Sequence, residues 1–370
     1  MNLLILGTRG IPGRHGGFET FAENLAIYLT ARGHHVTVYC QADTRPEVVN
    51  DTWNGIDRVH FYGKPGPAGT VEFDFAAVRD SLKRPGVILV LGYNTAVLSI
   101  FYRLCGRVSL MNMDGIEWKR EKWSWLQRLW LRINELAGAI LSNHLIADHP
   151  EIASHLERYV SREKITMIPY GADAVEPSDQ IDATSREFLA GLGLERNKYA
   201  IVVARPEPEN SLLEIVQGYM ASDRSIKLVI LGNLYPNENQ YHQKIMESAG
   251  PAVLFPGAIY DKTRLDTLRQ NALFYLHGHR VGGTNPSLVE ALAAGNAVIA
   301  HDNAFNRWVA GQGAEYFKGP DDLTVLLDTL TGDQERLAAM HQLNIQRHAK
   351  NFSQTKILEA YETLLEQYSH

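Results

Sequence analysis

Short apolar runs rich in β-branched residues alternate with amphipathic, helix-length segments along nearly the whole chain. Strands that alternate with helices in this way form βαβ units with right-handed crossovers and parallel sheets. We expect strands at residues 3–6, 36–39, 87–91, 108–113, 145–147 and 165–168, and again at 200–204, 227–231, 252–255, 273–276 and 297–300. The alternation therefore predicts an α/β fold built from doubly wound sheets.

A polar, proline-containing segment without periodicity, residues 173–182, lies between the two series of strands and is the candidate linker. A length of 370 residues suits two domains. We expect a first domain at 1–175 and a second at 180–350. The remaining segment, 351–370, contains apolar residues at helical spacing, so we expect a helix that packs back on the first domain.

Composition and charge exclude several classes of protein. The net charge is -6, which provides no positive field to hold a nucleic acid. Two cysteines are too few for a disulfide framework, and residues 1–7 are too short for a signal peptide. Residues 85–102 are uncharged, but polar residues interrupt them, so we interpret a strand, a loop and a helix rather than a membrane span. We expect a cytoplasmic protein.

Residues 7–17, GTRGIPGRHGG, form a glycine-rich turn that leads into a helix. Backbone N–H groups and the helix dipole at such a turn can approach an anion closely. The segment is neither a Walker loop nor a GxGxxG motif, and no acidic residue ends the second strand, so a nicotinamide cofactor is disfavoured. The alternative is a merely flexible loop.

A second candidate anion site lies in residues 276–295, LHGHRVGGTNPSLVEALAAG. Asn285 is a predicted N-cap, Pro286 the first helical residue and Gly295 the helix end. The amides of Gly283 and Thr284 would then be available to an anion.

Glu290 lies within this helix in an apolar context, where burial of a carboxylate is costly unless it is hydrogen-bonded. It is either a solvated helix position or an acceptor for sugar hydroxyls. His277 and His279, beside the same loop, are either site residues or ordinary polar loop residues. Asp321 and Asp322 open a helix, and their interpretation is dipole complementation rather than metal binding; we predict no metal site.

The segment GGTNPSLVEALAAG resembles the donor-binding segment of retaining glycosyltransferases of family 4, which have the two-domain GT-B fold. The opening GTRGIPGRHGGFETF and the block NMDGIEWKR at 112–120 resemble, more narrowly, the bacterial rhamnosyltransferases of surface-polysaccharide assembly. Further matches are IADH at 146–149, IPYGAD at 168–173 and VARPEPEN at 203–210. The likeness spans nearly the whole chain.

The resemblance implies a nucleotide-sugar donor held mainly by the second domain and an acceptor held mainly by the first. By position, Arg205 matches the arginine that contacts the donor diphosphate, and Glu290 matches the second glutamate of the E-x7-E pattern, which binds the nucleotide ribose. The other implied donor-binding residues are Gly16, Gly17, Gly283, Thr284 and Asn285.

Two residues depart from the family pattern. Gly282 replaces the first glutamate of E-x7-E, and Asn210 replaces the usual lysine five residues after the arginine. A deoxysugar donor would not need the missing carboxylate, and Arg14 or Arg280 could supply the missing charge.

Three candidate acceptor-side residues follow strands, where ligand-binding residues of parallel sheets lie. They are Asp114, Asp148 and Tyr170. Each of the three is either a cap or turn residue or, as the resemblance implies, a catalytic residue. The resemblance also implies a catalytic role for Arg205. No protein nucleophile is evident, so a front-face reaction is expected in which Asp148 or a phosphate oxygen takes the acceptor proton.

Residues 117–141 contain four of the six tryptophans and five basic residues, and we expect a helix there. An aromatic and basic amphipathic helix suits the headgroup region of an anionic membrane. The alternative is a buried helix with a charged edge. The membrane interpretation predicts peripheral attachment to the inner face of the cell membrane.

The resulting hypothesis is a retaining, metal-independent glycosyltransferase of the hexosyl or deoxyhexosyl class with no cofactor. It would move a sugar, with dTDP-rhamnose as the candidate donor, to a lipid-linked saccharide in cell-surface polysaccharide synthesis. Two alternatives are a nucleotide-sugar epimerase on the same fold and a non-catalytic two-domain sugar-binding protein.

Overall fold

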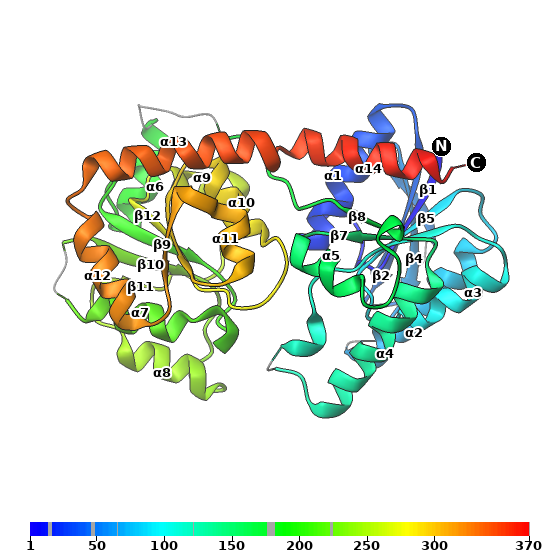
Figure 1. Ribbon diagram of the computed structural model, residues 1–370, viewed down its shortest axis with the longest axis horizontal. Coiled ribbons are helices and arrows are strands. Elements are labelled where there is room, and N and C mark those ends of the chain that lie inside the picture. The colour runs from blue at the N-terminus through cyan, green and yellow to red at the C-terminus, as the bar shows by residue number, and fades with distance from the viewer. Residues whose placement is uncertain are drawn as a thin grey trace. The chain divides into compact units, whose positions relative to one another are not determined.

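The computed structural model describes residues 1–13, 17–45, 49–64, 66–120, 122–175, 182–222 and 225–369. The chain forms two compact units, one of Met1–Pro169 with Ile357–His370 and one of Tyr170–Lys356. Tyr170, which we expected in the first domain, therefore begins the second unit. Residues 176–181 of the predicted linker lie outside the described residues. Each unit is a Rossmann-like α/β domain (Figure 1), which confirms the predicted fold class.

The first unit contains an eight-stranded sheet in the order β3-β4-β2-β1-β5-β6-β7-β8. All neighbouring pairs are parallel except β3 with β4. The strands are β1 (Asn2–Leu6), β2 (His35–Ala42), β3 (Asn50–Trp53), β4 (Ile56–Tyr62), β5 (Val87–Leu91), β6 (Ser109–Asn112), β7 (His144–Ala147) and β8 (Ile165–Met167). Gly7 follows β1 with a positive φ, and a Cβ there would collide with Leu91 of the neighbouring strand β5, so this turn requires glycine.

The helices of this unit are α1 (Gly17–Ala31), α2 (Pro67–Ser81), α3 (Ser99–Leu104), α4 (Trp125–Leu141), α5 (Pro150–Leu156) and the C-terminal α14 (Gln354–Gln367). Glu362 of α14 accepts hydrogen bonds from Arg32 Nε and His34 Nε2, both at 2.8 Å, and from the Tyr28 hydroxyl at 3.1 Å. The end of the chain thus packs on α1 and on the segment that precedes β2.

The predicted continuous helix from Glu117 to Leu141 is wrong at its start. Glu117–Lys119 form a single 3-10 turn, η2, and Arg120 is extended. A capping box stops α4 from extending backwards, because Ser124 Oγ accepts from the Gln127 amide and the Gln127 side chain accepts from the Ser124 amide.

The second unit contains a parallel six-stranded sheet in the order β11-β10-β9-β12-β13-β14. Its strands are β9 (Tyr199–Val203), β10 (Lys227–Leu231), β11 (Val253–Leu254), β12 (Phe274–His277), β13 (Ala297–His301) and β14 (Ala314–Phe317). Its helices are α6 (Ala183–Gly191), α7 (Leu212–Met220), α8 (Gln240–Ser248), α9 (Lys262–Gln270), α10 (Pro286–Ala293), α11 (Ala304–Ala310), α12 (Pro320–Leu330) and α13 (Gln334–Asn351).

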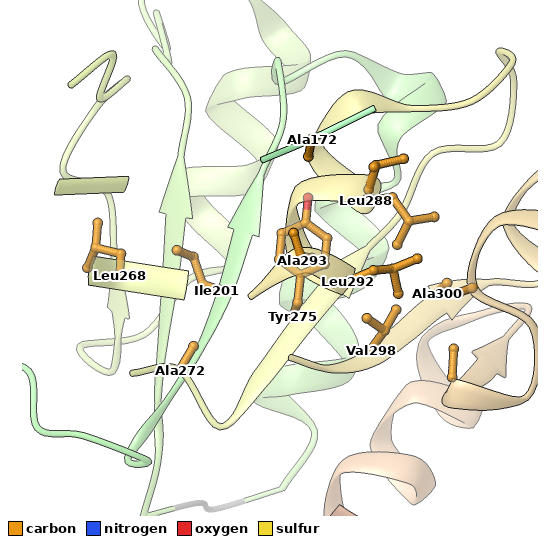
Figure 2. Close-up of a cluster of buried hydrophobic side chains, with 14 of the residues drawn as sticks. Ala172, Ile201, Leu268, Ala272, Tyr275, Leu288, Leu292, Ala293, Val298 and Ala300 are labelled. Carbon is orange, nitrogen blue, oxygen red and sulfur yellow. The ribbon is translucent and has the colours of Figure 1, made fainter. Parts of the chain in front are cut away.

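Successive residues of each strand in the second unit point into two different cores, one on each face of the sheet. Ile201, Tyr275 and Val298 pack with residues of α9 and α10 in the cluster shown in Figure 2. Ala200 and Phe274 pack with residues of α7 and α12 on the opposite face. Burial on both faces explains why these strands are almost continuously apolar in the sequence.

Asp74 of α2 is a buried acid that accepts a hydrogen bond from the Thr95 hydroxyl at 2.7 Å. Burial raises the pKa of Asp74 from 3.8 to about 6, although the hydrogen bond from Thr95 opposes this shift. In the unfolded chain the pKa of Asp74 keeps its ordinary value of 3.8. The free energy of unfolding therefore falls as the pH rises from 3.8 to about 6, and the full loss is present at every pH above about 6.

We predict that Asp74→Asn raises the free energy of unfolding at pH 8 by about 2 to 3 kcal/mol and changes it little at pH 4. Asparagine keeps an acceptor for Thr95 without the charge. Urea denaturation at both pH values measures this, with exposed Glu187→Gln as the control. An equal effect at the two pH values would contradict the assignment.

Candidate active site

Two loops of the second unit meet at the carboxyl edge of its sheet, because β9 and β12 are neighbours. Arg280 joins them: its amide donates to Glu209 O at 2.9 Å, and its Nη2 donates to Pro208 O at 2.7 Å. Gly278 allows this approach, since a Cβ there would collide with the carbonyl oxygen of Asn210. Arg205 and residues 283–285 therefore lie on two loops that contact each other.

The start of α10 has the predicted cap. Asn285 Oδ1 accepts from the Ser287 amide at 3.0 Å and from its hydroxyl at 2.8 Å, and Pro286 is the first helical residue. Gly283 is half-buried and Thr284 is buried. The helix N-terminus offers partial positive charge for a phosphate at this edge.

The two departures from the family pattern have structural reasons. The Asn210 side chain is buried and donates to the Arg205 carbonyl at 2.8 Å, so it fixes the backbone that carries this exposed arginine. Gly282 has a φ of 138°, a region that strongly favours glycine over glutamate.

Glu290 forms an ion pair with Arg269 of α9, which sequence reasoning missed. The Glu290 side chain is 41 % exposed, whereas that of Arg269 is 2 % exposed. The interpretation as a purely solvated position is therefore incomplete, because one carboxylate oxygen is held by a buried cation. The other carboxylate oxygen can accept a hydrogen bond from a ligand hydroxyl and so orient the ligand.

His277 is the last residue of β12, and it is buried rather than part of a polar loop. Its ring stacks on that of His279 with centroids 4.3 Å apart. Burial, together with the nearby His279 and His301, lowers the pKa of His277 well below its ordinary value. A neutral His277 adds no positive charge to this edge.

In the first unit, Asp114 follows β6 and adopts a left-handed backbone conformation with φ 50°. Its amide donates to Asn112 Oδ1 at 2.9 Å, and Asn112 Nδ2 donates to the Tyr361 hydroxyl at 2.7 Å. Non-glycine residues in this conformation are uncommon and are held by their surroundings. The C-terminal helix therefore positions Asp114 through Asn112.

Asp148 follows β7, the neighbour of β6, and is buried. Its interpretation as a helix cap is wrong: the cap of α5 is His149, whose Nδ1 accepts from the Glu151 amide at 3.0 Å. Burial raises the pKa of the Tyr361 hydroxyl, and the charge of Asp148 contributes to the same direction. Asp148 thus acts on Tyr361 through its charge, and Asp114 is linked to Tyr361 only through Asn112. Tyr170 is half-buried at the start of the second unit.

Glu135, on the inner face of α4, holds three neighbours together and was also missed. It accepts hydrogen bonds from Trp118 Nε1 at 3.1 Å, His155 Nε2 at 3.0 Å and the Tyr159 hydroxyl at 3.1 Å. Trp118 belongs to the segment after Asp114, and His155 belongs to the helix after Asp148. Glu135 therefore ties α4 to both candidate acceptor-side segments.

The glycine-rich loop differs from the predicted anion site. The Arg9 amide donates to Glu19 Oε1 at 3.3 Å, and the Gly13 amide donates to Glu23 Oε2 at 2.6 Å. These amides already bind carboxylates of α1, so the described part of the loop does not favour a phosphate. Gly17 is the exposed first residue of α1. Gly16, Arg14 and His15 lie outside the described residues.

In the part of the chain that the structure describes, one group has the spacing of a metal site: His34, Glu362 and Glu366. It lies at the start of β2, whereas Asp114 and Asp148 lie at the carboxyl ends of their strands. Glu362 already accepts from Arg32 and Tyr28, which competes with a cation.

Comparisons with known proteins agree with this division. Residues 1–173 match a family model described as a domain of unknown function (DUF1972), and residues 186–346 match the model described as glycosyl transferases group 1. The glycosyl transferases group 1 match therefore falls within the second unit.

Among curated proteins, the chain is similar to the phosphatidyl-myo-inositol mannosyltransferase of Mycolicibacterium smegmatis, with 27 % identity over 210 residues. The match covers 52 % of this chain and 53 % of the mannosyltransferase, so the chain spans about half the length of this curated relative.

Solved structures share the fold over nearly the whole chain. Sucrose-phosphate synthase from Thermosynechococcus elongatus has a TM-score of 0.81 and 15 % identity, covering 99 % of this chain and 98 % of that chain. The Anabaena protein HepE, solved in complex with UDP, has a TM-score of 0.76 and 16 % identity, covering 99 % and 100 %. The GT-B fold is confirmed; the rhamnosyltransferase subgroup stays a prediction.

The ion pair of Glu290 with Arg269 predicts a stability effect that differs between two substitutions. Glu290→Ala leaves a buried guanidinium without this partner and should lower the free energy of unfolding by about 1 to 3 kcal/mol. Glu290→Gln keeps an acceptor oxygen and should cost less than half as much. Chemical denaturation of both variants measures the difference, and equal stability of wild type and Glu290→Ala would show that the pair does not support Arg269.

Proposed function

We propose that the protein is a glycosyltransferase that takes a sugar from a nucleotide-sugar donor. The observation that carries the proposal is the carboxyl edge of the second sheet. There Arg205, the amides at the start of α10 and Glu290 occur within a glycosyl transferases group 1 domain. A nucleoside diphosphate is a good leaving group, so the protein mainly has to stabilise its developing negative charge and orient the acceptor hydroxyl.

The proposed donor contacts are confined to the second unit. Arg205 and the amides of residues 283–285 would bind the diphosphate, and Glu290, oriented by Arg269, would accept from the ribose hydroxyls. The backbone at Gly282 disfavours a carboxylate for the sugar. We propose dTDP-rhamnose, a deoxysugar donor, within the hexosyltransferase class.

The proposed acceptor residues are Asp114 and Asp148. Asp148 would take the proton of the acceptor hydroxyl, and Asp114 would orient that hydroxyl. Tyr170 remains part of the proposal as a hydrogen-bond donor to the acceptor. We propose retention of the anomeric configuration, no metal requirement and no cofactor, with a donor phosphate oxygen as the alternative base.

The proposed acceptor is a lipid-linked saccharide of cell-surface polysaccharide synthesis. The name of the mycobacterial relative, phosphatidyl-myo-inositol mannosyltransferase, includes a lipid and supports this class. Within the described ranges, no helix is long and apolar enough to cross a membrane. We propose that the protein is cytoplasmic and that it attaches peripherally to the inner face of the membrane through residues 117–141.

The direct test incubates the protein with dTDP-rhamnose, UDP-glucose or GDP-mannose and membrane-extracted acceptor, with and without EDTA. We expect sugar transfer from one donor, EDTA-resistant, with the anomeric configuration retained by proton NMR. Arg205→Ala should weaken binding of the matching nucleoside diphosphate about tenfold to a hundredfold by calorimetry, because a charged hydrogen bond is lost. The exposed Lys350→Ala serves as control. Epimerisation of the donor would instead indicate a nucleotide-sugar epimerase, and binding without turnover would indicate a non-catalytic sugar-binding protein.

Asp148→Asn separates acceptor chemistry from donor binding. The substitution keeps the shape of the buried side chain but removes its basicity, so we expect turnover to fall about a hundredfold or more. Donor affinity should stay within about twofold of wild type, because the proposed donor contacts lie in the other unit, and an unchanged circular dichroism spectrum and melting temperature would show that the variant is folded. Wild-type turnover at saturating acceptor would assign Asp148 a structural role.

A further inference from the structure

Helix α4 presents an apolar face to solvent. Its inner face is buried and includes Leu131, Glu135 and Ala139. Its outer face carries large apolar side chains whose exposure ranges from 43 % to 72 %: Trp125, Leu126, Leu129, Trp130, Ile133, Leu136 and Ile140. Single exposed apolar residues are ordinary, but a continuous set along one helix marks an interaction surface.

The apolar surface continues onto two further helices. On α3, Ile100, Phe101 and Leu104 are exposed, with Leu104 at 75 %. On α2, Val71 and Phe75 are exposed, and the rings of Phe75 and Phe101 lie 6.0 Å apart in an edge-to-face arrangement. Helices α3 and α4 contact each other, and the three helices lie together in the first unit (Figure 1). We refer to the exposed apolar residues of α2, α3 and α4 as the three-helix face.

Basic residues accompany the three-helix face, although the whole chain has a net charge of -6. Lys119 and Arg132 lie over the ring of Trp118, and Lys122 lies over the ring of Trp123. The only acid of α4, Glu135, is buried and hydrogen-bonded. Glu117 is paired with Arg120, and Glu72 of α2 is exposed. Further basic residues of the three helices are Arg79 on α2, Arg103 on α3 and Arg128 on α4.

We infer that the three-helix face is a docking surface for a bilayer of anionic phospholipid. The inference deepens the proposed function and rests on it, because it names the surface that brings the protein to a lipid-linked acceptor. Apolar side chains would insert at the level of the headgroups while the basic residues contact lipid phosphates. A second copy of the chain fits less well, since a symmetric contact would bring the basic residues of both copies together.

The same helix connects the membrane surface to the acceptor-side residues. Glu135 on its inner face holds Trp118, four residues after Asp114, and His155, seven residues after Asp148. Docking through the outer face would therefore keep both aspartates beside the helix that contacts the lipid. A saccharide attached to a membrane lipid could then reach Asp114 and Asp148 while its lipid stays in the bilayer.

Leu104→Glu tests the part of the surface that lies outside α4. The substitution places a charge at a highly exposed position, so the fold should be unaffected. It replaces an apolar side chain that would contact the bilayer with a negative charge that the anionic lipid repels. We expect binding of the full chain to phosphatidylglycerol-containing vesicles to fall about tenfold in co-sedimentation. The matched control is Val325→Glu, which changes a 64 % exposed residue of α12 and should bind like wild type.

A second pair of measurements makes the outcomes distinct. Arg128→Glu with Arg132→Glu should abolish the preference for phosphatidylglycerol over phosphatidylcholine vesicles. Absence of wild-type binding, equal loss in the Val325→Glu control, or a dimer in solution that Leu104→Glu dissociates would each overturn the inference. Nucleoside diphosphate affinity, measured without vesicles, should be unchanged in all variants. A protein that binds vesicles but transfers no sugar would overturn only the proposed function.

Discussion

Parallel strand pairing is the constraint on which both groups of candidate residues depend. In a parallel sheet the carboxyl ends of neighbouring strands meet at one edge, so the loops that follow them become neighbours whatever their distance in sequence. Pairing of β9 with β12 brings the Arg205 loop against the loop that opens α10. Pairing of β6 with β7 does the same for Asp114 and Asp148. Each unit thus assembles its polar residues from segments that are separated in the chain.

Secondary contacts then give these residues their orientation. Buried Arg269 holds one oxygen of half-exposed Glu290, and buried Asn210 holds the backbone of Arg205. In the first unit, Tyr361 of the C-terminal helix reaches Asp114 through Asn112. Such supporting groups fix the direction of a functional side chain, which matters because catalytic and binding geometry tolerates only small displacements.

Local signals predicted the local features well. The apolar runs located most strands, and Asn285 followed by Pro286 located the start of α10. The hairpin of β3 and β4 was missed although Asn54 and Gly55 form its turn with positive φ at both residues, a recognisable hairpin signal.

Partners that depend on the tertiary fold had no such signal. Arg269 precedes Glu290 by 21 residues, and Tyr361 lies 249 residues from Asn112. The glycine-rich loop was expected to bind an anion, but α1 folds so that Glu19 and Glu23 accept hydrogen bonds from the amides of Arg9 and Gly13. The most direct test of the account is a crystal structure with a bound nucleoside diphosphate. We predict the phosphates within hydrogen-bond distance of Arg205 and the amides of residues 283–285, with the ribose at Glu290; a diphosphate bound away from these residues would contradict the account.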